Sequence, residues 1–189
     1  MPYNLRQRPG TTEEKVRKAE DAYARVADDP RVELFADPQN IPTRLIKWAM
    51  SYTRDALNVL RDSVMKADLL RNISLFNVLL AEANEDRPNQ AVVFYTQAAK
   101  ANYKAGTIYR RSGHPEAAEA FLEAGNCHEE AGNKMLAADS YRMVRTDPSD
   151  APAHIIRDAR MAEIDSRDAR VAARERVRQQ RDRSPSPQR

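Results

Sequence analysis

Arginine is the most abundant side chain in this sequence that can pair with anions, with 24 arginines against 7 lysines. Five arginines near the C-terminus are spaced 3, 4, 4 and 3 residues apart: Arg167, Arg170, Arg174, Arg178 and Arg181. At about 100° per residue they would share one stripe of a helix, about 80° wide. Because guanidinium groups pair with phosphates and carboxylates, this stripe predicts contact with nucleic acid or with an acidic protein surface. The alternative is a solvated helix whose arginines pair with neighbouring acids.

Residues suited to covalent or metal chemistry are few. Cys127 is the only cysteine, and the histidines are His114, His128 and His154. Cys127 and His128 would point about 100° apart on a helix, which is wrong for a nucleophile and its base. A helical zinc motif would need a second histidine four residues after His128, where Gly132 stands. We therefore expect no catalytic residue, metal site or cofactor, and we interpret Cys127 as a small core residue.

The two ends of the chain have compositions typical of disordered segments. Residues 184–189 read SPSPQR, in which Ser184 and Ser186 each precede a proline and are candidate phosphorylation sites. Phosphates there would cancel part of the arginine charge. Residues 1–10 read as a flexible basic arm that could contact a partner or an anion. The alternative for both ends is that they have no specific role.

A short pattern built around glycine recurs in the middle of the chain. Residues 104–114 read KAGTIYRRSGH and residues 123–133 read EAGNCHEEAGN. Each copy is followed by a pair of alanines and then by an aromatic residue, Phe121 or Tyr141. Repetition at about 20 residues is typical of helices stacked in an array.

Glycine has two predicted roles in this pattern. Gly113 and Gly132 should follow helix ends, where the backbone needs a positive φ. Gly106 and Gly125 should lie inside helices, where a missing side chain lets the next helix approach and an aromatic ring fill the gap. The pattern predicts helices at 88–112, 115–131 and 134–146, with Pro115 in the first turn of the second.

Residues 117–133, which read AAEAFLEAGNCHEEAGN, and the following Ala137-Ala-Asp-Ser-Tyr141 resemble the soluble NSF attachment proteins and, more broadly, tetratricopeptide-like repeats. The resemblance covers about residues 88–148 and implies antiparallel helical hairpins stacked in a short array. The acidic, leucine-bearing tail of the attachment family is absent. ATPase docking and SNARE binding are therefore not carried over to this chain.

The N-terminal half is also predicted to be helical. Thr11-Thr-Glu-Glu14 starts a helix that runs to about Ala27, and a short apolar piece follows at 31–36. Residues 43–87 contain neither proline nor glycine and keep apolar residues at helical spacing. We expect two helices there, at 43–63 and 67–86. The alternative is one continuous helix about 65 Å long.

These elements predict an all-α fold, with a basic arm at 1–10, a helical-repeat domain at 11–148, a charged arginine-rich helix at 149–183 and a tail at 184–189. No apolar run approaches the length of a membrane span, and no signal-peptide pattern begins the chain. Together with the lone cysteine, this predicts a cytoplasmic protein, with the nucleus as the alternative.

The predicted function is a non-enzymatic adaptor or scaffold that binds protein partners. The candidate contact residues are Tyr103, Thr107, Arg110 and Arg111. One alternative is a small structural or nucleic-acid-associated protein, for instance a viral one, that uses its arginine-rich ends, although the net charge is only +3. Another is self-assembly into a homo-oligomer, because terminal repeats need capping.

Overall fold

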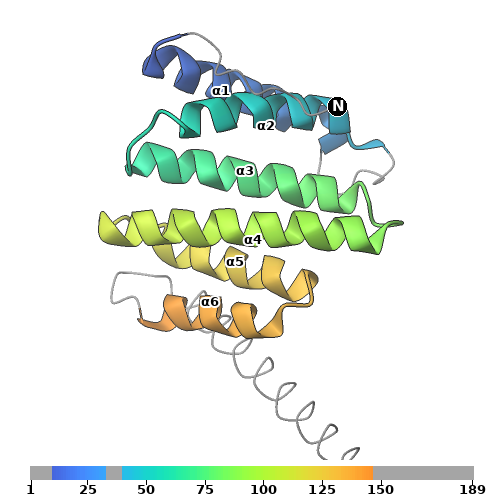
Figure 1. Cartoon of the computed structure of the whole chain (residues 1–189), viewed down its shortest axis with the longest axis vertical. Coiled ribbons are helices and arrows are strands. Elements are labelled where there is room, and N and C mark those ends of the chain that lie inside the picture. The colour runs from blue at the N-terminus through green and yellow to red at the C-terminus, as the bar shows by residue number, and fades with distance from the viewer. Residues whose placement is uncertain (1–9, 33–39, 147–189) are drawn as a thin grey trace, which may run out of the picture.

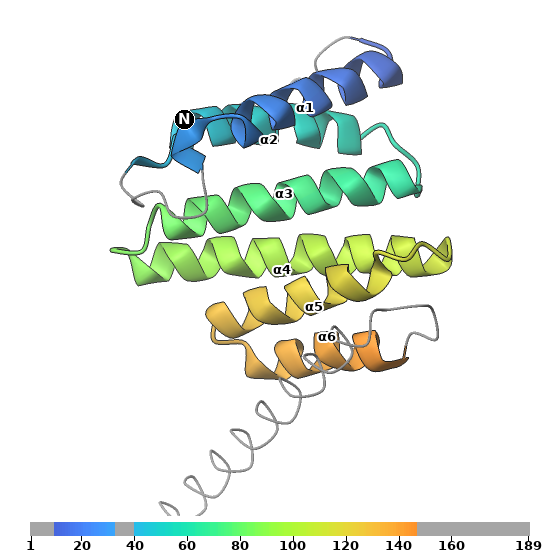
Figure 2. The same ribbon diagram turned by 180° about the vertical axis from the view of Figure 1, so that it is seen from behind.

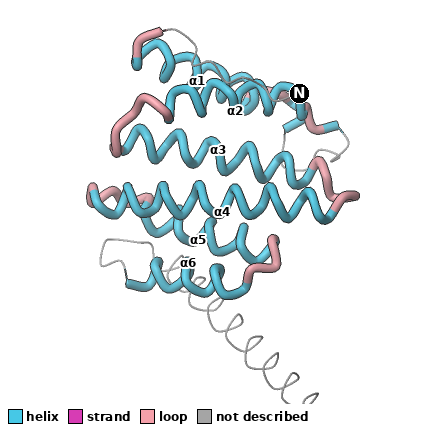
Figure 3. The backbone as a smooth tube through the Cα atoms, viewed as in Figure 1, coloured by secondary structure: helices cyan, strands magenta, loops and turns pink. Residues whose placement is uncertain are grey.

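The computed structural model of the chain describes residues 10–32 and 40–146. Within these ranges it consists of helices and turns without a strand, which confirms the predicted all-α fold (Figure 3). In chain order the elements are α1 (Thr12–Ala27), the short 3-10 helix η1 (Pro30–Val32), α2 (Thr43–Leu57), α3 (Val64–Glu82), α4 (Pro88–Arg111), α5 (Ala117–Glu130) and α6 (Lys134–Thr146).

The helices lie next to one another in chain order, from α1 at one end to α6 at the other (Figure 1). Each packs against the helix that precedes it, and from α2 to α6 short turns reverse the chain between neighbours. Helices α1 and α5 lie behind α2 and α4 in Figure 1 and in front of them in Figure 2. They therefore share one face of the molecule, and this face carries the site described below.

Polar caps define where the N-terminal helices begin. Thr11 and Glu14 form the predicted cap of α1, because each donates its backbone N–H to the other's side chain, at 3.1 and 3.2 Å. Ser63 caps α3 by accepting a hydrogen bond from the backbone N–H of Lys66 at 3.3 Å. Because this cap begins a new helix, residues 43–86 form two helices and not one. The gap between them is longer than predicted, because α2 already ends at Leu57.

The turn glycines have the predicted conformation. Gly113 has φ of +67° and Gly132 has φ of +72°. After each glycine the next backbone N–H donates back to the helix, from His114 to the Tyr109 carbonyl at 2.9 Å and from Asn133 to the His128 carbonyl at 2.7 Å. Both copies of the pattern thus end in the same helix cap. Pro115 lies in the turn before α5, which begins at Ala117, and not within its first turn as predicted.

The glycines inside the helices lie against aromatic rings. A Cβ on Gly106 would come within 3.0 Å of the Phe121 ring, and one on Gly125 would overlap the Tyr141 ring. Both rings are fully buried. Each copy of the repeated pattern therefore packs a glycine of one helix against an aromatic residue of the next, as the sequence predicts.

Several predicted features lie outside the described residues. These are residues 1–9 of the basic arm, the part of the apolar piece from residue 33, the five-arginine stripe, His154, Ser184 and Ser186. Among the described helices, none combines the length and apolar character needed to cross a membrane.

Candidate partner-binding groove

A groove runs along α3, with α4 as its floor. Residues of α5 line one side of it, and the other side is lined by Tyr23 of α1 and by Arg31, Val32 and Ile41. It contains two cavities, of about 440 and 680 Å³, which share Leu75 and Val78 of α3 and so follow one another. Residues of α3 line it at spacings of three and four: Asp68, Arg71, Leu75, Val78 and Glu82. Because such spacing places side chains on one face of a helix, α3 presents a continuous stripe to the groove.

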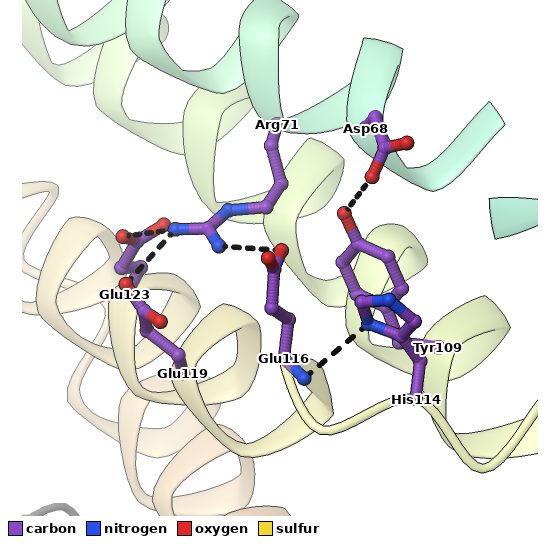
Figure 4. A network of polar contacts seen from close by, with 7 residues as sticks. All are labelled: Asp68, Arg71, Tyr109, His114, Glu116, Glu119 and Glu123. Carbon is purple, nitrogen blue, oxygen red and sulfur yellow. Dashed lines mark hydrogen bonds and ion pairs between the residues drawn. The ribbon is translucent and has the colours of Figure 1, made fainter. Parts of the chain in front are cut away.

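Arg71 connects the two walls at one end of the groove. Its guanidinium reaches from α3 to three carboxylates, one just before α5 and two in the first half of that helix (Figure 4). Nη1 lies 3.1 Å from Glu116 Oε2, and Nη2 lies 3.2 Å from Glu119 Oε1 and 2.6 Å from Glu123 Oε1. These three ion pairs join α5 to α3.

The shared guanidinium does not neutralise its three partners equally. Burial by itself would lower the pKa of Arg71, but the charges of Glu123 and Glu119 outweigh it and raise that pKa. The pKa of Glu123 is raised as well, because its burial outweighs the attraction of Arg71 and Glu119 repels it. This end of the groove therefore keeps an excess of negative charge that a further cation would stabilise.

A second polar contact lies beside the first. The Tyr109 hydroxyl of α4 donates a hydrogen bond to the carboxylate of Asp68 on α3 (Figure 4). Burial, and then this hydrogen bond, raise the pKa of Tyr109, so the phenol stays protonated as a donor. The His114 ring stacks on Tyr109 with centroids 4.8 Å apart, and His114 Nδ1 accepts from the backbone N–H of Glu116 at 3.4 Å. These contacts join the ends of α3, α4 and α5.

The floor of the acidic end holds an unsatisfied acceptor. Asn102 of α4 lines the cavity and is only 2% exposed, yet its Oδ1 has no hydrogen-bond partner within the described residues. Cys127 lines the same cavity, and burial raises its pKa to about 12, so the thiol stays protonated. Its burial agrees with the predicted core position.

The groove becomes apolar in its middle and acidic again at its far end. In the middle, Leu75 and Val92 are 38% and 39% exposed and lie beside Tyr95. Beyond them the second cavity is lined by three carboxylates and one guanidinium: Glu82, Glu85, Glu130 and Arg31. Burial, with repulsion from Glu85, raises the pKa of Glu82. The groove thus offers an apolar strip between two acidic ends.

The residues predicted to bind a partner lie elsewhere on α4. The Tyr103 ring contacts the Phe121 ring edge-on at 5.3 Å, and the Arg110 guanidinium lies over the same ring at 5.3 Å. Thr107 donates its hydroxyl to the Tyr103 carbonyl, and exposed Arg111 lies 3.8 Å from Asp62. Tyr103 and Arg110 therefore come together. Arg111 instead lies near Asp62, before α3, and none of the four residues lines the groove.

Sequence reasoning did not identify the groove residues. One usable signal was present: residues 115–131 contain five glutamates without a lysine or arginine, and Arg71 is the only basic residue between Lys66 and Arg87. An isolated arginine in an apolar helix needs acidic partners, and the glutamate-rich helix supplies them. The spacing within each helix did not say which faces meet.

Groups of histidine, cysteine, aspartate and glutamate arranged to hold a metal ion do not occur in residues 10–32 and 40–146. Comparisons of the chain with protein-family models, with curated proteins and with solved structures found no match. A function for the groove therefore has to be inferred from its own shape and charge.

Proposed function

We propose that this protein is a non-enzymatic helical adaptor that holds a segment of a protein partner in the groove between α3 and α5. The observation that carries this proposal is the continuity of the two cavities along α3, with an apolar strip between acidic ends. Exposed apolar residues lined up in a groove are typical of sites that take an amphipathic segment.

The charge of the groove specifies the kind of segment. Carboxylates at both ends favour basic side chains, while Leu75, Val78 and Val92 favour apolar ones between them. From Asp68 to Glu82 the groove wall is about 21 Å long at about 1.5 Å per residue. A helical partner segment of about four turns, with basic and apolar residues on one face, would fill it.

The proposal predicts that a charge placed on the apolar strip abolishes binding. Leu75→Asp should weaken binding of a fluorescent helical peptide, with arginine and isoleucine alternating on one face, by about tenfold or more, because it buries an unpaired charge. Fluorescence anisotropy with the full chain measures this. Leu136→Asp is the matched control, since Leu136 is 47% exposed on α6 away from the groove.

Equal affinities of the two leucine variants would contradict the groove as the binding site. Circular dichroism on both variants checks that helicity is kept. The variant Arg110→Glu with Arg111→Glu tests the α4 face predicted from the sequence. Loss of binding in that variant alone would move the interface from the groove to that face.

Self-assembly is a second candidate function, supported by exposed apolar residues on the last described helix. Met135 is 60% exposed and Leu136 is 47% exposed on α6. Apolar side chains on an end helix are suited to pairing with a second copy, as terminal repeats need a cap. Mass measurement in solution decides this, because a strict monomer at high concentration would eliminate self-assembly.

A further inference from the structure

We infer that the groove binds the arginine-rich C-terminal segment of its own chain, residues 156–174, so that the adaptor is closed until a partner displaces this segment. The inference rests on the proposed function of the groove. It begins from two features of the groove end that contains Arg71. Carboxylates outnumber the Arg71 guanidinium there, and the buried acceptor Asn102 Oδ1 has no hydrogen-bond partner in the described part of the chain.

These features call for a ligand that is both cationic and rich in hydrogen-bond donors. Asp68, Glu116, Glu119 and Glu123 present carboxylate oxygens, and Asn102 adds an amide oxygen at the floor. A guanidinium carries five N–H donors and a permanent charge, and it accepts nothing. Arginine is therefore the side chain that this end of the groove would select.

The segment has the pattern that the groove requires. At spacings of three and four residues, the sequence places basic and apolar side chains alternately on one helical stripe: Ile156, Arg160, Ile164, Arg167, Val171 and Arg174. If helical, residues 156–174 would be about 27 Å long, against about 21 Å for the groove wall. Arg160 and Arg174 would lie about 21 Å apart, as Asp68 and Glu82 do, and so match the carboxylates at the two ends, while Ile164 and Val171 match the apolar strip between them.

The chain leaves the described bundle at the correct end. Near the end of α6, Met143 Sδ accepts a contact from Arg110 Nη1 at 3.8 Å. Arg110 is at the C-terminal end of α4, and the turn that follows leads to Glu116, just before α5. The next nine residues, 147–155, can span up to about 30 Å when extended. The segment can therefore enter the groove at its acidic end, next to Arg71.

Covalent connection favours the segment of the same chain over that of a second copy. A short linker gives an effective concentration in the millimolar range, roughly, which exceeds the concentration of free chains in most samples. An external basic segment must then compete with the internal one, and its apparent affinity falls in proportion.

Charge reversal on the stripe should open the groove. In the full chain, Arg167→Glu with Arg174→Glu is expected to bind the arginine–isoleucine peptide about tenfold more tightly than the wild type does. Arg176→Glu with Arg183→Glu makes the same charge change on the opposite side of the helix and should bind as the wild type does. Equal gains in both double variants would overturn the inference.

Paramagnetic relaxation enhancement tests directly whether the segment occupies the groove. It also distinguishes the segment of the same chain from that of a second copy. A nitroxide on Gln179→Cys, in a Cys127→Ser background, should broaden the amide signals of Leu75 and Val92 but not those of Arg54 on α2. The broadening should vanish with Arg167→Glu and Arg174→Glu and persist with Arg176→Glu and Arg183→Glu. A mixture of spin-labelled chains and isotope-labelled chains without nitroxide should show none.

The outcomes distinguish the two proposals. Absence of broadening in the labelled full chain, or broadening that appears in the mixture, overturns docking within one chain. If the peptide still binds and Leu75→Asp abolishes that binding, the groove keeps its adaptor function while the inference fails. If the peptide binds to none of the variants, the proposed function fails.

Discussion

Individual polar residues in this bundle are buried with incomplete hydrogen bonding, and His128 is the clearest case outside the groove. It is 5% exposed on α5, and its Nδ1 has no hydrogen-bond partner among the described residues. Burial lowers the pKa of His128, and the positive charge of Lys100 lowers it further. The folded protein therefore disfavours the charged imidazole, whereas the unfolded chain accepts a proton near its ordinary pKa of 6.5.

This difference makes stability depend on pH in a defined direction. The unfolded state binds more protons between the lowered pKa and 6.5, so the unfolding free energy falls as pH decreases through that window. His128→Gln should remove this component, which amounts to at most about 1.4 kcal/mol per pH unit. Urea unfolding of both proteins between about pH 5 and 8.5 measures it. A difference in unfolding free energy between the two proteins that stays constant below pH 6.5 would contradict this reading.

At the scale of the helix, the unit that recurs is a glycine of one helix under an aromatic ring of the next. Gly106 lies against Phe121, and Gly125 lies against Tyr141, whose hydroxyl donates to Asn126 Oδ1 at 2.9 Å. The missing side chain lets α5 approach α4, and α6 approach α5, closely enough for both rings to be fully buried. Helix spacing here depends on two glycines and not on helix propensity, which glycine lowers.

The two glycines should respond differently to alanine. Gly125→Ala should lower the unfolding free energy by about 1 to 3 kcal/mol, because its Cβ would overlap the Tyr141 ring. Gly106→Ala should be nearly neutral: a Cβ 3.0 Å from the Phe121 ring needs only a small shift, which a gain in helix propensity of about 1 kcal/mol offsets. Urea unfolding followed by circular dichroism compares them. The reverse order would refute this account of the contact.

At the scale of the whole molecule, Arg71 joins helices that are not neighbours in the chain. Its partners are 45 to 52 residues further along, on the far side of α4 in the sequence. The contact therefore fixes α5 relative to α3 while both pack on α4. It also contributes to the charge of the groove, so that the packing of the bundle and the charge of this cavity depend on the same residue.

Arg71→Gln should leave three carboxylates close together without their cation. The expected loss of unfolding free energy is about 1 to 2 kcal/mol, a modest value because the glutamate side chains are 38 to 48% exposed. The loss should shrink in about 1 M salt, which screens the repulsion. Urea unfolding at low and high salt measures both effects, with exposed Arg54→Gln on α2 as control. A loss that is independent of salt would argue against an electrostatic cause.

The sequence by itself determined the features that depend on neighbouring residues. Helix starts such as Thr11, positive-φ turns at Gly113 and Gly132, and the glycine–aromatic units all follow from spacings within about one repeat. Even there, the break between α2 and α3 lies at residues 58–63 and not at the predicted 64–66. Helix boundaries depend on individual caps, and Ser63 was one of several polar residues that could have served.

Only the tertiary structure decided which helix faces meet. The pairing of Arg71 with Glu116, Glu119 and Glu123, and the continuity of the two cavities, depend on the rotation of α3 and α5 about their axes over α4. Periodicity identifies a face of one helix but carries no information about the partner face, because that choice is made by packing across the whole core. The groove could therefore be recognised only once these helices were placed together.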